Sequence, residues 1–244
     1  MTVHVDRDGD VLRLRLDNPG RGNALSPEMA RRLAEIFAEV EAGDELVAVV
    51  ITGTGRSFCA GADVRASAAL GDAGRRLEFL DAARHVVQAI ARAPVPVVAA
   101  VNGPALAGGL EIVLGCDLVV AAESAQFGDL HLMHGRIPGW GGATLLARRC
   151  GQLRATELLL LGTRWDAGTA LANGLITEVV ADARLGAAVD RIADTLRQPD
   201  RAVLRQMIAL IRDVGGRPPA EVLAVEWSHF ARHFGVPDPG VVDL

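Results

Sequence analysis

The chain has 244 residues, a formal net charge of −5 and a hydrophobic share of 50%. That length predicts one domain, or one domain with a helical extension. The acidic balance argues against a nucleic-acid partner, because basic surfaces are what bind phosphates. No apolar run approaches the roughly 20 residues that a membrane-spanning helix needs, so no membrane partner is expected.

The cysteines and the first residues bear on where the protein works. Cys59, Cys116 and Cys150 are odd in number and show no CxxC spacing. Residues 1–6 lack the shape of a signal peptide. We therefore expect reduced cysteines in the core of a cytoplasmic protein.

Two residue types are missing from the sequence. All 25 basic residues are arginine, and there is no tyrosine. Schiff-base chemistry and phosphate binding through lysine, and acid–base catalysis through tyrosine, are therefore excluded. An anionic ligand must be held by arginine, by backbone N–H groups or by helix ends.

Strand patterns recur through the first half of the chain. Apolar and polar residues alternate over residues 12–16, which is typical of a strand with one buried face. Residues 46–52, 97–101 and 117–121 are apolar runs typical of buried strands. Helical patterns separate them, and this alternation predicts a mainly parallel sheet with helical crossovers.

Two helices are predicted between these strands. Ser26 followed by Pro27 is typical of a helix start with serine as the N-cap. A second helix is expected at about residues 77–92. The predicted buried faces are Met29, Leu33, Ile36, Phe37 and Val40 in the first helix, and Leu80, Ala83, Val87 and Ile90 in the second.

After about residue 143 the pattern predicts helices only. The candidates are residues 143–150, 155–161, 167–171, 185–196, 202–214 and 219–234. We therefore predict an α/β core over residues 1–190 and a C-terminal helical region over residues 191–244. The mean hydropathy of +0.25 indicates that apolar surface is hidden between subunits.

The segment from Asn102 to Glu111 is the most informative part of the sequence. It joins an apolar strand to a helix start through a glycine-rich turn. Backbone N–H groups converge at such a helix start, and Gly108 lets a substrate oxygen approach the main chain. Glu111 lies about one turn further along, so its carboxylate can move a proton beside that oxygen. This arrangement favours an enzyme that stabilises an enolate.

Several segments together resemble the crotonase (enoyl-CoA hydratase/isomerase) superfamily. Their order and spacing match the family over roughly residues 10–235. The matching segments are residues 16–19, 23–26, 50–53, 58–63, 102–111, 126–128, 135–139 and 162–179.

The resemblance implies a crotonase-like core of stacked ββα units, with C-terminal helices that pack a homotrimer, often doubled to a hexamer. It implies a thioester substrate of coenzyme A or of an acyl-carrier protein, with no other cofactor and no metal. The N–H groups of Ala62 and Gly108 would form the oxyanion hole, and Glu111 falls on one of two catalytic glutamates. The residues implied in substrate or coenzyme A binding are Arg21, Ala24, Ala60, Asp63, Val64 and Trp140.

The sequence departs from the family at three places. His131 stands where the second catalytic glutamate is usual, and it is either a proton carrier or a hydrogen-bonded structural histidine. Trp140 replaces a small residue and is expected to narrow or reshape the acyl pocket. The C-terminal region is shortened at the end: the family usually continues beyond Leu244 with a helix that contacts the nucleotide, which keeps a carrier-protein thioester open as the substrate.

Two aspartates and a second histidine near these motifs also need an interpretation. Asp63 is expected to cap a helix rather than to carry a proton. Asp129 is expected to be an exposed turn residue. His131 and His134 have no third ligand in view, so no metal site is predicted.

The leading functional hypothesis is hydration of a 2-enoyl thioester. Glu111 would hold or activate water, and His131 would exchange the proton at Cα. The first alternative is double-bond isomerisation, which needs one proton carrier and no water. Decarboxylation or C–C cleavage of a specialised thioester, and a non-catalytic acyl-CoA-binding paralogue, also stay open.

Overall fold

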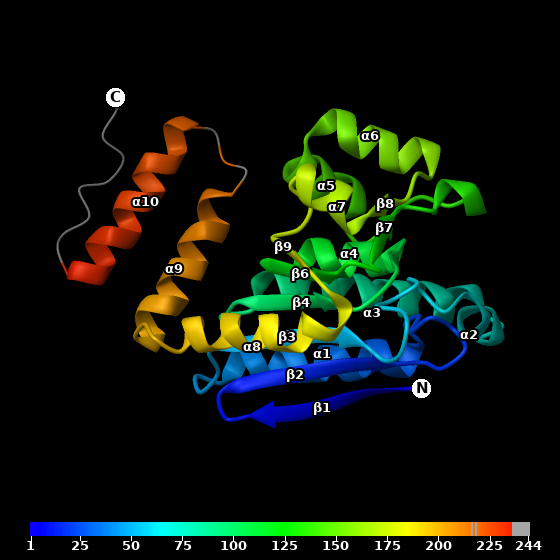
Figure 1. Ribbon diagram of the computed structural model, residues 1–244, viewed down its shortest axis with the longest axis horizontal. Coiled ribbons are helices and arrows are strands. Elements are labelled where there is room, and N and C mark those ends of the chain that lie inside the picture. Colours follow the sequence, from blue (N-terminus) through cyan, green and yellow to red (C-terminus); the bar gives the residue numbers. More distant parts are fainter. Residues whose placement is uncertain (216, 218, 236–244) are drawn as a thin grey trace.

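The computed structural model describes residues 1–215, 217 and 219–235. Its main sheet consists of β1 (Thr2–Asp8), β2 (Val11–Asp17), β3 (Ala48–Gly53), β4 (Val97–Val101), β6 (Leu118–Ala122) and β9 (Glu178–Val180). The strand order is β1-β2-β3-β4-β6-β9 (Figure 1). Only β1 and β2 pair antiparallel, and the other neighbours are parallel, as the alternating pattern predicts.

A smaller sheet lies next to the site described below. It consists of β5 (Ala105–Leu106), β7 (Gln126–Gly128) and β8 (Trp165–Asp166). β5 follows β4 almost directly, so the glycine-rich segment runs from the large sheet through the small one into a helix.

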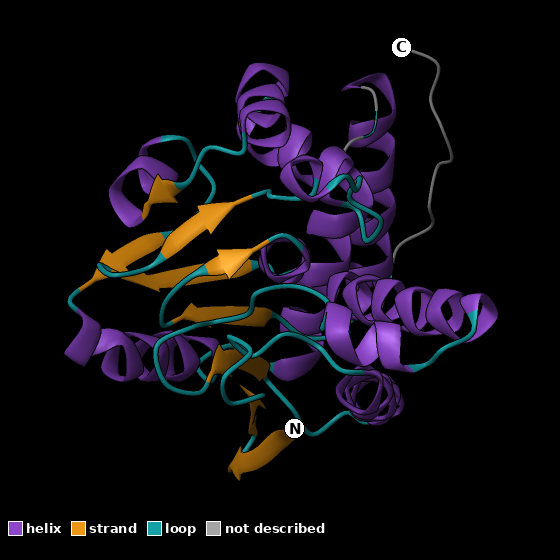
Figure 2. Cartoon of the chain, turned by 90° about the vertical axis from the view of Figure 1, so that its right-hand side faces the viewer, coloured by secondary structure: helices purple, strands orange, loops and turns teal. Residues whose placement is uncertain are grey.

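Helices cover both faces of the main sheet (Figure 2). They are α1 (Pro27–Ala42), α2 (Val64–Ala69), α3 (Ala73–Arg92), α4 (Gly108–Gly115), α5 (Gly142–Cys150), α6 (Gln152–Leu161), α7 (Ala167–Ala172), α8 (Leu185–Leu196), α9 (Arg201–Val214) and α10 (Pro219–Phe234), with short 3₁₀ turns at Leu132–His134 and Asp182–Arg184. Helices α1, α3 and α4 enclose the larger core on one face, and α8 packs on the other against β3, β4 and β6.

The sequence prediction for α1 is confirmed. Ser26 is the N-cap, and its hydroxyl oxygen accepts a hydrogen bond from Met29 N at 3.2 Å. All five residues of the predicted apolar stripe are buried against the core. Helix α1 therefore forms where a capping residue and a helical apolar period coincide.

Two predictions about local structure are wrong, and one strand was missed. Leu80 of α3 is 40% exposed, and Phe79 is buried instead. The prediction of helices alone after residue 143 misses β8 and β9, which are too short for a periodic pattern and form because they pair with β7 and β6. The antiparallel edge strand β1 was not predicted.

The last two helices stand apart from the sheet at one side of the molecule (Figure 1). Arg212 of α9 joins them to the core, because its guanidinium contacts the Asp117 carboxylate at 2.6 Å and the Ala93 carbonyl oxygen. The predicted division at residue 190 lies inside α8 and stays a prediction, and residues 236–244 of the predicted C-terminal region lie outside the described residues.

Cysteines and membrane spans can be checked in the same part of the chain. The three cysteines are free thiols: Cys59 and Cys116 are buried, whereas Cys150 is half-buried. No helix within the described residues combines the length and apolarity that crossing a membrane requires.

Candidate active site

A strained turn places the first backbone donor. Ala107, the residue before α4, has φ 50° and ψ −119°, a conformation that residues with a side chain rarely adopt. Its N–H donates to the Gly128 carbonyl oxygen at 3.0 Å, which ties the turn to β7. Gly108 is the first residue of α4, and no described residue accepts a hydrogen bond from its N–H.

A second loop brings Ala62 next to this helix start. The Leu106 N–H donates to the Cys59 carbonyl oxygen at 2.9 Å. A Cβ at Gly109 would lie 1.9 Å from that same oxygen, so only glycine allows α4 to approach so closely. A Cβ at Gly61 would lie 3.0 Å from Gly108 N. The N–H of Ala62, like that of Gly108, has no acceptor among the described residues, so two unpaired backbone donors lie side by side.

Asp63 holds the Ala62 loop in place. One of its carboxylate oxygens accepts from the N–H groups of Arg65 and Ala66, and the other accepts from the Asn18 amide at 3.1 Å. Burial raises the pKa of Asp63, but these hydrogen bonds outweigh it and lower the pKa overall. Asp63 is thus the N-cap of α2, as the sequence predicted, and it remains charged.

Glu111 is almost fully buried in the first turn of α4, and its two oxygens have different surroundings. Oε1 accepts from Trp140 N at 2.7 Å and from Gly142 N at 2.9 Å. Oε2 receives no hydrogen bond from any described residue and lies 3.9 Å from Nε2 of His131. One oxygen therefore anchors the carboxylate, and the other is free for chemistry.

Asp129 contradicts its sequence prediction, because it is 1% exposed and hydrogen-bonded rather than an exposed turn residue. Its carboxylate contacts His131 Nδ1 at 2.9 Å and also accepts from the His131 backbone N–H at 3.0 Å. Because Asp129 accepts the hydrogen bond from Nδ1–H, Nε2 is the nitrogen that faces Glu111. The three side chains form a line from Asp129 through His131 to Glu111.

The surroundings raise the pKa values of both Glu111 and His131. Burial raises the pKa of Glu111, and it outweighs the two backbone N–H groups and the His131 charge. Burial lowers the pKa of His131, but the hydrogen bond and charge of Asp129, together with the charge of Glu111, more than offset it. His131 therefore keeps its proton to a higher pH than an ordinary histidine does.

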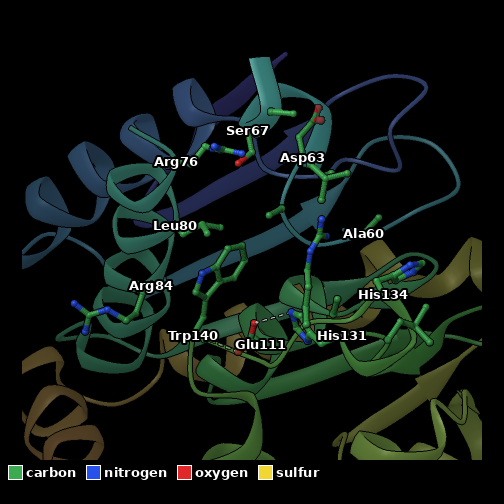
Figure 3. A pocket seen from close by; sticks show the side chains of 18 of the residues that line it. Ala60, Asp63, Ser67, Arg76, Leu80, Arg84, Glu111, His131, His134 and Trp140 are labelled. Atoms are coloured by element: carbon green, nitrogen blue, oxygen red, sulfur yellow. Dashed lines mark hydrogen bonds and ion pairs between the residues drawn. The ribbon is translucent and has the colours of Figure 1, made fainter. Parts of the chain in front are cut away.

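These groups open into a cavity of about 920 Å³. Figure 3 shows Glu111 and His131 pointing toward one another beside the ring of Trp140. That ring packs against Gly108: a Cβ there would lie 2.2 Å from Trp140 Cζ3. Trp140 is 7% exposed and forms a wall next to the helix start.

The structure gathers nearly all of the predicted site residues. Nine of them line the cavity: Arg21, Ala24, Ala60, Ala62, Asp63, Val64, Glu111, His131 and Trp140. Gly108 is adjacent, with the Trp140 ring packed against it. Sequence reasoning missed the role of Asp129, the strain at Ala107 and the lining residue Arg136; for Asp129, its position two residues before His131 was the available signal.

Comparisons with known proteins agree on the family of this chain. A model of the enoyl-CoA hydratase/isomerase family matches residues 6–237. The chain belongs to this family. Its fold is accordingly the crotonase fold: the enoyl-CoA hydratase from Bacillus anthracis superposes with a TM-score of 0.91 at 29% identity, covering 97% of this chain and 92% of that one.

Curated relatives fit the family but carry different activities. A probable enoyl-CoA hydratase of Rhizobium meliloti is 37% identical over 185 residues, which is 75% of this chain and 70% of the relative. The 1,2-epoxyphenylacetyl-CoA isomerase of Escherichia coli is also 37% identical, over 83% of this chain and 75% of its own length. Family membership alone therefore does not distinguish hydration from isomerisation, and the geometry of the site has to be used for that.

Proposed function

We propose that the protein is an enoyl-thioester hydratase. The observation that carries the proposal is the pair of facing proton carriers, with the unbonded Oε2 of Glu111 3.9 Å from Nε2 of His131. Hydration needs one group to take a proton from water and another to deliver one to the substrate. The thioester oxygen would meanwhile accept hydrogen bonds from Ala62 N and Gly108 N, which stabilise the enolate.

In the proposed hydration, Glu111 and His131 together account for every proton that moves. Glu111 takes a proton from water, and the resulting hydroxide bonds to Cβ of the enoyl group. The C=C electron pair moves toward the thioester carbonyl, and the imidazolium of His131 gives its proton to Cα. The proton on Glu111 then returns to His131, so the site is ready for another substrate and the product is a 3-hydroxyacyl thioester.

Double-bond isomerisation is the second candidate, since the matched family comprises both hydratases and isomerases. In that reaction a single group removes a proton from one carbon and returns it to another. His131 or Glu111 alone would suffice, and no water would react.

The deciding experiment offers the purified protein crotonyl-CoA, 3-butenoyl-CoA and the corresponding carrier-protein thioesters. We expect hydration, which removes the ultraviolet absorbance of crotonyl-CoA and yields a 3-hydroxy product. This reaction should depend on Glu111. Conversion of 3-butenoyl-CoA to crotonyl-CoA without a hydroxy product would instead establish an isomerase. Binding without turnover of any thioester would establish the non-catalytic paralogue.

We also propose self-association through the last two helices, as a homotrimer or hexamer. Apolar side chains on α9 and α10 are exposed in the single chain, among them Met207, Ile211, Trp227 and Phe230 at 52%, 55%, 48% and 47%. Large exposed apolar patches mark interfaces. Sedimentation velocity at micromolar concentration should show a trimer or hexamer, and a clean monomer would contradict the proposal. A cytoplasmic location and the absence of any other cofactor stay predictions.

A further inference from the structure

Five arginines line the cavity that holds Glu111 and His131, namely Arg21, Arg65, Arg76, Arg84 and Arg136. Arg84 is neutralised, because its guanidinium contacts Asp81 at 2.6 Å. None of the other four lies within ion-pair distance of a carboxylate in the part of the chain that the structure describes. The cavity therefore presents positive charge that the protein does not itself pair.

Arg136 differs from the other three in its position. It follows His131 by five residues, and its N–H donates to the His131 carbonyl oxygen at 2.9 Å. Its positive charge lowers the pKa of His131, as the weakest of the influences on that group, so the guanidinium is within electrostatic range of the histidine. Arg21 and Arg65, by contrast, flank the loops around Ala24 and Val64, where the nucleotide is expected.

The two carboxylates beside His131 have partners of their own, although Oε2 of Glu111 accepts no hydrogen bond from a described residue. Asp129 is paired with His131, and Oε1 of Glu111 is held by two backbone N–H groups. Among the described residues neither carboxylate lies within ion-pair distance of Arg136; both instead lie beside His131. Trp140, Ile137 and Leu130 line the same cavity and supply apolar surface, which suits the carbon chain of a short acyl group.

We propose that the acyl group taken by this site ends in a carboxylate, and that Arg136 binds that carboxylate. The proposal rests on the proposed function, because it names the substrate class of the same reaction. A guanidinium can donate to both carboxylate oxygens at once, which fixes the orientation of the chain as well as its charge. A bound carboxylate would also neutralise Arg136, so His131 would retain its proton more firmly when such a substrate is present.

The same arginine chemistry could instead serve the phosphates of coenzyme A. The two sources make different predictions, because every coenzyme A ester carries the phosphates whereas only some acyl groups carry a carboxylate. The test therefore compares matched acyl groups on one carrier.

The experiment measures kcat/KM for crotonyl-CoA and glutaconyl-CoA, which differ by a carboxylate in place of one methyl hydrogen. We expect the full-length protein to favour glutaconyl-CoA by about 10-fold or more, the size of a charge-assisted contact. Arg136→Met should bring this ratio close to one, and Arg136→Lys should keep part of it. Arg148→Met, an exposed arginine of α5 outside the cavity, is the matched control and should keep the wild-type ratio.

Binding of saturated analogues separates failure of this proposal from failure of the proposed function. Glutaryl-CoA and butyryl-CoA can be compared by calorimetry whether or not any thioester turns over. Equal affinities, or a ratio that Arg136→Met leaves unchanged, would overturn the carboxylate proposal while hydration of crotonyl-CoA could still stand. If Arg136→Met weakened the binding of both esters and of free coenzyme A equally, Arg136 would bind the phosphates. That result would also overturn the carboxylate proposal.

Discussion

The two sides of the site hold their reactive groups in different ways. On the oxyanion side, the donors are the backbone N–H groups of Ala62 and Gly108, fixed by loops that pack against each other. On the proton-transfer side, Asp129, His131 and Glu111 are side chains fixed by hydrogen bonds. Backbone donors do not titrate, so that side depends on packing alone, whereas the other side depends on pH.

The largest effect is expected on the proton-transfer side. Glu111→Gln keeps an oxygen that can accept from Trp140 N and Gly142 N but removes the basic carboxylate. Because a general acid–base group contributes about 10²–10⁴-fold, kcat should fall by that amount with little change in KM. Stopped-flow or initial-rate assays check this. A fall of less than threefold would show that Glu111 only holds the helix start.

The next largest effect is expected from packing on the oxyanion side. A Cβ at Gly108 would lie 2.2 Å from Trp140 Cζ3, so Gly108→Ala must displace the ring or the N–H. Losing one oxyanion donor costs about 10²–10³ in kcat. Trp140→Ala in the same chain should restore part of the rate by making room.

A matched glycine tests whether this loss is local. At Gly186 in α8, an added Cβ would have no neighbouring atom within 4 Å, so Gly186→Ala should leave the rate unchanged. Gly108→Ala should also show no pH-dependent change, because no titrating group is altered. A shifted pH profile in that variant would contradict the separation of the two sides.

A pH profile isolates the proton carriers with a smaller effect on rate. Because the Glu111 pKa is raised and its carboxylate must be charged, kcat/KM should fall as pH drops through a value above 4.5. Because the His131 pKa is raised and its imidazolium must be protonated, kcat/KM should fall as pH rises through a value above 6.5. The expected profile is a bell between these two limits.

Asp129→Asn should move mainly the alkaline limb of that bell, because the Asp129 charge is only the weakest of the influences on the Glu111 pKa. The amide removes the negative charge that raises the His131 pKa, so this limb should shift to lower pH. At neutral pH the rate should drop by roughly 10-fold, the size of a hydrogen bond to a charged group. His131→Gln should abolish the limb, and an unchanged limb in both variants would make His131 structural.

The smallest effect on activity is expected from the support of α4. The Arg149 guanidinium caps this helix by donating to the carbonyl oxygens of Val113, Leu114 and Cys116. Arg149→Met removes the guanidinium donor from the Leu114 and Cys116 carbonyl oxygens, while that of Val113 keeps the Cys116 N–H, and this should lower the free energy of unfolding by about 1–3 kcal/mol. Chemical denaturation measures this, and kcat should change by less than about threefold. A large loss of kcat with unchanged stability would mean that Arg149 acts on the chemistry.

The sequence by itself determined the chemistry-bearing residues and the elements with strong periodic patterns. The N-cap and apolar stripe of α1, the glycine-rich turn before α4 and the position of Glu111 follow from local residue types and spacing, whereas His131 was placed in the site by the family resemblance. Local propensity and periodicity act over a few residues, so they are readable without a fold.

Only the tertiary structure decided how these parts meet. The strands β8 and β9 exist because partners far along the chain pair with them, and Leu80 turns to the cavity although its spacing predicts burial. From the sequence, Asp129 is predicted to be a turn residue, whereas the fold buries it against His131. From the sequence, Trp140 is only a bulky replacement of a small residue; the structure shows that its ring packs on Gly108. Burial and charge pairing depend on the surroundings in space, and it is these surroundings that set the pKa values and the shape of the site.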